Sequence, residues 1–216
     1  MDFREICDRV AELATLDGLG DKFTSSSVGR HVNSMYKILL TEARAIHDVE
    51  TTYVTVANSD TLSLTGREWA EVECVVINSI TLERTSLERL RKMSNSWWNT
   101  AAGTPTQWWF SGYSRIKLYP TPSDAWSVAV YGYRAPSALS GTDVPDCPEY
   151  THEPLAEGAY ARLVKSIAVD DLQARSADME ARFAAAASKF RTQCIIRRSG
   201  DLGRDVQPAA IYAVRS

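Results

Sequence analysis

The residues best suited to metal or acid–base chemistry in this sequence are three histidines, His31, His47 and His152. A metal site built on one helix needs a second ligand three or four residues from the first, because those positions share a face. None of the three has another histidine or a cysteine at that spacing. We therefore expect no metal site, and we expect surface or helix-capping positions for all three histidines.

Paired carboxylates and a glycine-rich segment are the other candidates for chemistry. The pairs are Asp143/Asp146 and Asp170/Asp171, and paired acids can serve glycoside hydrolysis. Neighbours on a helix point about 100° apart, so Asp170 and Asp171 do not converge. The segment "GLGDKFTSS" lacks the spacing of a phosphate-binding loop and does not follow a strand. We expect solvated acids, no catalytic residue, no cofactor and no enzymatic activity.

Cysteine spacing and the N-terminal segment bear on the compartment. Cys7, Cys74, Cys147 and Cys194 form no C-x-x-C pair, which favours free thiols in a reducing cytoplasm. The opening "MDFREICDRVAEL" is amphipathic and lacks the basic and apolar regions of a signal peptide. No apolar run reaches the ~18 residues of a membrane span, so we expect no membrane association.

Apolar residues recur at helical spacing near both ends of the chain. The stripes are Phe3, Ile6, Val10, Leu13; Val28, Val32, Met35, Leu39, Ala43, Ile46; Leu155, Ala159, Leu163, Ile167, Leu172; and Met179, Phe183, Ala186, Phe190. Gly18 and Gly20 separate the first two stripes, and a break near Ala174 separates the last two. We predict an α+β fold in which N- and C-terminal helix pairs, over 1–49 and 154–195, form one antiparallel bundle.

Residues 50–136 change to the alternating period of strands. The strand candidates are "TTYVTVA", "TLSLT", "EWAEVECVVINSITL", "RIKLY" and "WSVAVYGY". The last two flank the turn-forming "PTPSD" and predict a β-hairpin, whereas Thr85–Glu88 fits the capping box of a single helix. We expect a mostly antiparallel β module with one helix, inserted between the helix pairs and followed by a linker over 137–153.

The last segment, 196–216, contains two glycines and a proline and has little periodicity, so we predict an extended arm. From Arg191 onward the chain holds five arginines and two aspartates, whereas the rest carries a net charge of −6. Three interpretations stay open: phosphate contacts to nucleic acid, docking to a protein through the planar arginine fork, and an unused terminus.

Five motifs follow one another in an order typical of a known family. They are "LERLRKMSNSWWN", "GTPTQWWF", "IKLYPTPSD", "VAVYGYRAP" and "DVPDCPEYTHEPLAEGAY", within residues 82–165. The sequence resembles the head-to-tail adaptor, or connector, proteins of short-tailed and related bacteriophages. The flanking helices also fit that family in order and length. The β module is larger than in the simplest helical adaptors, which leaves open what it contacts.

The resemblance implies a structural protein of the virion neck, made in the host cytoplasm. The implied partners are the portal protein, neighbouring subunits in a dodecameric ring, a tail or nozzle protein, and genomic DNA that passes through without sequence-specific binding. Candidates for the portal interface are Arg191, Arg197, Arg198, Arg204, Tyr212 and Arg215. Candidates for docking to the tail or to a neighbour are Trp108, Trp109, Tyr119, Trp126 and Tyr131.

An alternative is a β-rich module that belongs to the tail or binds a receptor or carbohydrate. Its basis is the tryptophan-rich segment of Trp97, Trp98, Trp108, Trp109 and Trp126, since exposed aromatic faces suit sugar stacking. A glycan array with no binder would count against this alternative.

Overall fold

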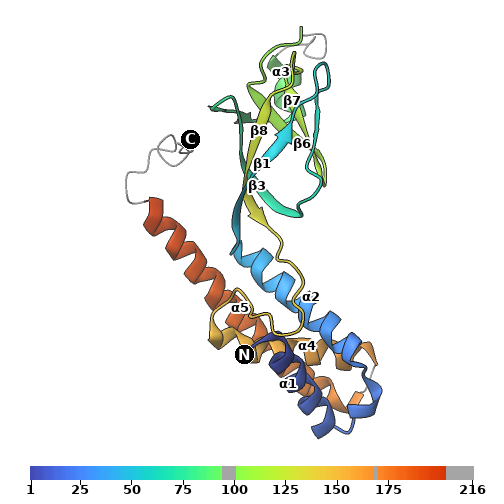
Figure 1. Ribbon diagram of the computed structural model, residues 1–216. Coiled ribbons are helices and arrows are strands. Elements are labelled where there is room, and N and C mark those ends of the chain that lie inside the picture. The colour runs from blue at the N-terminus through green and yellow to red at the C-terminus, as the bar shows by residue number, and fades with distance from the viewer. Residues whose placement is uncertain (94–100, 168–169, 203–216) are drawn as a thin grey trace. The chain divides into compact units, whose positions relative to one another are not determined.

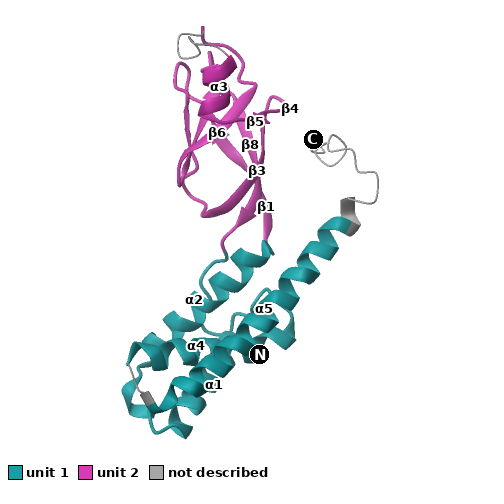
Figure 2. Ribbon diagram, turned by 180° about the vertical axis from the view of Figure 1, so that it is seen from behind, with its two compact units in different colours: residues 1–45, 136–216 teal, residues 46–135 magenta. Residues whose placement is uncertain are grey.

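The computed structural model describes residues 1–93, 101–167 and 170–202, and it divides the chain into two compact units. Figure 2 colours them separately: a helical unit made of Met1–Ala45 together with the chain from Pro136 onward, and a β unit, Ile46–Ala135. The helical unit is thus built from both ends of the chain, and helical elements flank a β module as predicted. Each unit is described by itself.

The helical unit contains four α-helices and three short 3₁₀ helices in its described part (Figure 1). These are α1 Phe3–Leu16, η1 Gly20–Lys22, α2 Ser25–Ala43, η3 Glu149–Thr151, α4 His152–Ser166, η4 Asp170–Leu172 and α5 Gln173–Leu202. Asp2 and Glu5 form a reciprocal capping box at the start of α1. The Thr24 hydroxyl accepts a hydrogen bond from the Ser27 amide at the start of α2.

Helix α4 packs against α1, α2 and α5, and its burial extends around most of its surface. Leu155, Ala159 and Leu163 of the predicted stripe are buried. Gly158 lies where α4 approaches its neighbours most closely. A Cβ atom there would lie 2.8 Å from Met35 Cε of α2 and 3.0 Å from Phe183 Cγ of α5. Side-chain bulk on α4 is therefore restricted at this point.

The irregular segment that leads into η3 is held to α2 by hydrogen bonds. The Asn33 side chain donates to the Leu139 carbonyl (3.0 Å) and accepts from the Leu139 amide (2.7 Å). The Tyr36 hydroxyl accepts from the Asp146 amide at 3.1 Å. Backbone polar groups of this loop thus find partners on the bundle.

The described part of the β unit contains one short helix, α3 Leu87–Met93, and two four-stranded sheets. One sheet has the order β1 (His47–Val54), β8 (Ser127–Arg134), β3 (Trp69–Ile77), β4 (Ile80–Thr81); the other has β2 (Thr61–Ser63), β7 (Arg115–Tyr119), β6 (Gln107–Gly112), β5 (Glu83–Arg84). The β5–β6 pair is parallel and the others are antiparallel. Side chains of both sheets share one core around the fully buried Trp108.

The predicted hairpin between "RIKLY" and "WSVAVYGY" is wrong. These segments are β7 and β8, which belong to different sheets. Pro120 and Pro122 lie between them and cannot donate to a ladder. The connecting segment pairs elsewhere: the Gly103 amide donates to the Thr121 carbonyl at 2.8 Å. The proline-rich turn therefore carries the chain from one sheet to the other.

The predicted long strand "EWAEVECVVINSITL" is instead two strands of a tight hairpin. Asn78 and Ser79 adopt left-handed conformations, with φ of 50° and 64°, and reverse the chain between β3 and β4. Asparagine tolerates this region because its side chain can hydrogen-bond locally. The alternation continues through the turn, so the pattern alone did not reveal it.

Two boundaries of the predicted C-terminal elements also differ. Helix α4 ends at Ser166, so the break comes before Ala174. Helix α5 continues to Leu202, so the extended arm expected from residue 196 is helical in its first seven residues. Residues 203–216, the rest of the predicted arm, lie outside the described residues.

Candidate assembly surfaces

The middle of α5 is anchored to the helical unit by aromatic and polar contacts. Phe190 is buried, and the Tyr150 hydroxyl of η3 donates to the Gln193 side chain at 2.8 Å. The Lys189 ammonium lies 4.4 Å from the centroid of the Tyr150 ring, within cation–π range. These contacts fix the direction in which the rest of α5 projects.

From Cys194 to Ser199 no side chain of α5 is fully buried. Ile195 and Ile196 are 48% and 62% exposed, although isoleucine is among the residues most often buried. The 30 residues of α5 span about 45 Å, and Figure 1 shows its last turns projecting past the other helices of the unit. The helix end thus presents apolar side chains to solvent.

Three of the predicted portal-interface residues lie on this projecting part of α5. Arg191 and Arg197 are exposed, and Arg198 is half-buried, with its Nε donating to the Cys194 carbonyl at 3.3 Å. Together with Ile195 and Ile196 they form a surface of mixed apolar and basic character, which we call the α5 tip (residues 191–198). The other three candidates, Arg204, Tyr212 and Arg215, lie outside the described residues.

The aromatic docking candidates of the β unit differ in exposure. Trp108, Trp109 and Tyr131 are buried, and they lie in β6 and β8, the inner strands of their sheets. Their side chains have little surface to offer a partner. Tyr119 and Trp126 are half-buried and remain available at the ends of β7 and β8.

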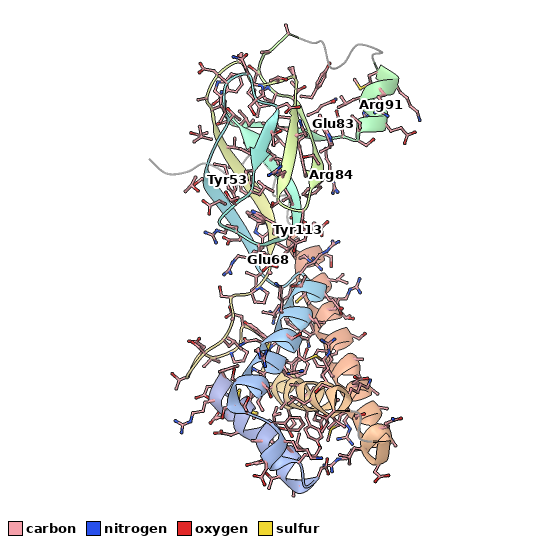
Figure 3. The ribbon with its side chains drawn as sticks, turned by 90° about the vertical axis from the view of Figure 1, so that its right-hand side faces the viewer. Tyr53, Glu68, Glu83, Arg84, Arg91 and Tyr113 are labelled. Carbon is pink, nitrogen blue, oxygen red and sulfur yellow. The ribbon has the colours of Figure 1, made fainter. Side chains whose placement is uncertain are left out.

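The Arg84 side chain lies over two aromatic rings of β6. The Arg84 guanidinium lies 5.6 Å from the Trp108 ring and 5.4 Å from the Phe110 ring, and the two rings meet edge to face. Arg84, labelled in Figure 3, is exposed and belongs to the edge strand β5. Sugar stacking would need an exposed indole face. Trp108 and Trp109 do not provide one, Trp126 is half-buried, and Trp97 and Trp98 lie outside the described residues.

A family model described as SU10 adaptor protein matches residues 1–207. The chain belongs to the SU10 adaptor protein family. The match covers both units and confirms the resemblance to phage head-to-tail adaptors that the motif order predicted. This SU10 adaptor is accordingly a structural component of a phage virion. None of the curated proteins compared with it matches the chain.

Each histidine of this SU10 adaptor belongs to a different element: His31 to α2, His47 to β1 and His152 to α4. His31 Nδ1 is 2.9 Å from the Ser27 carbonyl, and His47 Nε2 is 3.7 Å from Glu73. His152 is buried, and burial lowers its pKa. Across the described ranges, no group of three or more His, Cys, Asp or Glu is placed to hold a metal ion.

Asp143 and the cysteines of the SU10 adaptor have structural surroundings, not catalytic ones. Asp143 accepts hydrogen bonds from the amide and hydroxyl of Ser140 within a turn. The four cysteines are free thiols, and burial raises the pKa of Cys7 to about 11, which makes its thiolate scarce at neutral pH. No helix in the described part of the chain is long and apolar enough to cross a bilayer.

Sequence reasoning missed an exposed tyrosine and an ion-pair cluster on the β unit of the SU10 adaptor. Tyr113, in the turn between β6 and β7, is 80% exposed and lies near Glu68 (Figure 3). Arg67 pairs with Asp48 and Glu50 of the edge strand β1. Hydrogen bonds from Thr52, together with Arg67, lower the pKa of Glu50 to about 2. Glu50 and Asp48 are 17 and 19 residues from Arg67 in the sequence, so no local sequence pattern indicates these ion pairs.

Proposed function

We propose that this SU10 adaptor forms a ring beneath the portal of the capsid, extends the DNA channel and provides the platform for tail attachment. The observation that carries the proposal is the family match over residues 1–207. In this role the protein acts through assembly and not through catalysis. DNA passes through the ring without sequence-specific contacts.

The α5 tip is the proposed portal contact. Aliphatic residues and arginines are suited to protein interfaces, because they combine apolar area with planar donors for carboxylates. Ile195 and Ile196 supply the apolar area, and Arg191, Arg197 and Arg198 supply the donors. The exposed helix end supports this assignment, since neither isoleucine is buried by the described part of the chain. Arg204, Tyr212 and Arg215 would extend the contact.

Tyr119 and Trp126 of the β unit are the proposed sites for tail or neighbour docking. Half-buried aromatic residues can gain buried area in a complex while their backbone positions stay fixed. Trp126 packs against the β-unit core with part of its ring. The proposal assigns no docking role to Trp108, Trp109 or Tyr131, whose side chains are already buried.

Co-expression with the portal protein tests the role and the contact together. Cryo-EM or native mass spectrometry of the purified portal should show a closed ring of adaptor subunits bound to it. A chain without residues 197–216 should lose portal attachment, and Ile195→Asp/Ile196→Asp should weaken attachment at least tenfold. Removal of only residues 203–216 separates the contribution of the helix end from that of the following segment.

Ala184→Asp/Ala185→Asp is the matched control, since it adds two charges at exposed positions of the same helix outside the α5 tip. Absence of any adaptor on the portal under assembly conditions would contradict the proposed function. Full attachment of the chain that lacks 197–216 would contradict only the proposed contact.

A further inference from the structure

A basic groove lies on the helical unit between α2 and α4. It has a volume of about 580 Å³ and is lined by Arg30, His31, Ser34, Arg162, Lys165 and Ser166. The Arg162 guanidinium donates to the Ser34 hydroxyl at 3.3 Å, which connects the two walls. We call these six residues the basic groove.

The positive charge of the basic groove is only partly neutralised within the unit. Residues 25–41 of α2 and 158–166 of α4 contain no Asp or Glu. Lys165 pairs with Glu180 of α5, whereas no ion pair joins Arg30 or Arg162 to any described carboxylate. Two guanidinium groups thus line one concave surface with their charges unmatched. Planar guanidinium groups bind carboxylates through parallel hydrogen bonds, so the groove suits an acidic ligand.

The same unit carries a surface of opposite character on α1. Asp8, Ala11, Glu12, Thr15 and Leu16 follow one another at i, i+3, i+4, i+7 and i+8, so they share one helix face. All five are exposed, and they border a hollow of about 500 Å³. We call these five residues the acidic stripe. Leu16, at 73% exposure, ends the stripe with an unpacked apolar side chain.

The carboxylates of the acidic stripe are also incompletely matched. Glu12 pairs with Arg9 at 3.0 Å, but Arg9 is shared with Glu153 at 2.8 Å. Asp8 has no ion pair with a described residue. Its carboxylate and that of Glu12 are one helical turn apart, roughly 5–6 Å between Cβ atoms. That spacing allows both to contact one partner surface.

We propose that the acidic stripe of one adaptor subunit docks into the basic groove of the next copy. The two surfaces are distinct, so the contact is heterologous: every subunit offers one stripe and one groove, and the contact repeats from copy to copy until a ring closes. Arg30 and Arg162 receive Asp8 and Glu12, and Leu16 gains cover from solvent. The inference rests on the proposed function in one respect, namely that copies of the chain lie side by side in an assembly.

The charge complementarity favours a second copy of the chain over nucleic acid as the occupant. A phosphate backbone would account for the groove alone, whereas a neighbouring subunit accounts for the groove, the acidic stripe and the exposed Leu16 together. Exposed charge pairs are screened by salt, so the contact should weaken as ionic strength rises.

Mixing two charge-reversed chains tests the inference. One variant carries Arg30→Glu/Arg162→Glu and the other carries Asp8→Arg/Glu12→Arg. In either variant alone, groove and stripe carry charges of the same sign and repel each other. Ring occupancy on the portal, counted by native mass spectrometry, should therefore fall at least tenfold. In a 1:1 mixture each reversed groove faces a reversed stripe, and rings of alternating subunits should form again. Arg91→Glu and Glu42→Arg, at exposed positions outside both surfaces, should assemble like the natural chain.

The outcomes separate this inference from the proposed function. If the natural chain forms rings and the mixture does not, although both variants are folded by circular dichroism, the inference is wrong and the proposed function stands. If the natural chain forms no ring on the portal, both are wrong. Normal rings from the groove variant, combined with loss of double-stranded DNA binding, would make the groove a phosphate site and would also overturn the inference.

Discussion

The Tyr160 hydroxyl donates a hydrogen bond to the Asp17 carboxylate, which also pairs with Arg175. The contact joins the end of α1 to α4 and to the start of α5. Burial and the adjacent carboxylate raise the pKa of Tyr160, so its proton stays in place at neutral pH. Three helices are thus linked through one carboxylate that is only 6% exposed.

Replacing Tyr160 by phenylalanine removes a donor from that carboxylate and leaves the ring in place. Since hydrogen bonds to charged groups contribute roughly 1.5–3 kcal/mol, Tyr160→Phe should lower the free energy of unfolding of the helical unit by about 2 kcal/mol. Urea denaturation monitored by circular dichroism measures the change. Tyr150→Phe, which removes a hydroxyl from a neutral partner, should cost about half as much. Equal stability of Tyr160→Phe and the natural chain would contradict the role of this contact.

Replacing Gly158 by alanine should destabilise the helical unit. In most helices Gly→Ala stabilises by roughly 0.5–1 kcal/mol, but here the new Cβ would lie 2.8 Å from Met35 Cε and 3.0 Å from Phe183. Overpacking of this kind costs about 1–3 kcal/mol, so Gly158→Ala should lower the melting temperature. Gly29→Ala in α2 is the matched control, because its nearest neighbour is the end of the Phe3 ring at 3.3 Å. A Gly158→Ala chain that melts above the natural one would show that α4 is packed more loosely than the structure has it.

Gly132 allows β8 to pass close to an irregular part of β3. A Cβ there would lie 2.1 Å from the Glu71 carbonyl oxygen and 2.9 Å from Val72 Cα. Both are backbone atoms, which cannot move away by rotation of a side chain. Gly132→Ala should therefore destabilise the β unit by at least 3 kcal/mol, roughly the upper end of ordinary overpacking. Near-ultraviolet circular dichroism, which reports on packed aromatic side chains such as Trp108, measures the loss of stability. Gly112→Ala, in β6 with open space around it, should be close to neutral.

The stability of the helical unit should fall as the pH drops below about 6.5, the ordinary pKa of histidine. Burial lowers the pKa of His152, so the folded chain resists a proton that the unfolded chain accepts. Stability from this group is fully present above the unfolded pKa and is lost as pH falls toward the folded pKa. Melting temperatures of the natural chain and His152→Gln, measured from pH 7.5 to 5, provide the test. The difference between the two slopes should be largest below pH 6.5, and parallel curves would exclude His152 as the cause.

The sequence predicted the helical segments that pack against the core and misjudged the end of α5, which does not. Helix α4 could be predicted from Leu155, Ala159 and Leu163, because its core contacts require apolar residues at helical spacing. The end of α5 has no such contacts in the described part of the chain, so its apolar pattern fades although the helix continues to Leu202. A loss of apolar periodicity predicts the end of a helix. At the end of α5 it reflects a loss of packing contacts instead, because the helix continues to Leu202.

The positions of the strands were predicted better than the pairing between them. The alternation of β7 and β8 indicated two strands correctly, but pairing depends on contacts that the pattern does not contain. The Pro120–Pro122 segment was interpreted as a hairpin turn, and it connects two sheets instead. The basic groove was beyond sequence reasoning for the same reason, because Ser34 and Arg162 are 128 positions apart.

The β unit begins and ends at adjacent points of one sheet. His47 of β1 pairs with Tyr133 of β8, and the Arg134 amide donates to the Ile46 carbonyl at 3.0 Å. The chain therefore leaves the helical unit and returns to it through neighbouring backbone positions, and a loop of a few residues could close the same gap. The insertion is in this sense a replaceable module: its strands can lengthen, shorten or be exchanged for another fold without requiring any helix to change its course.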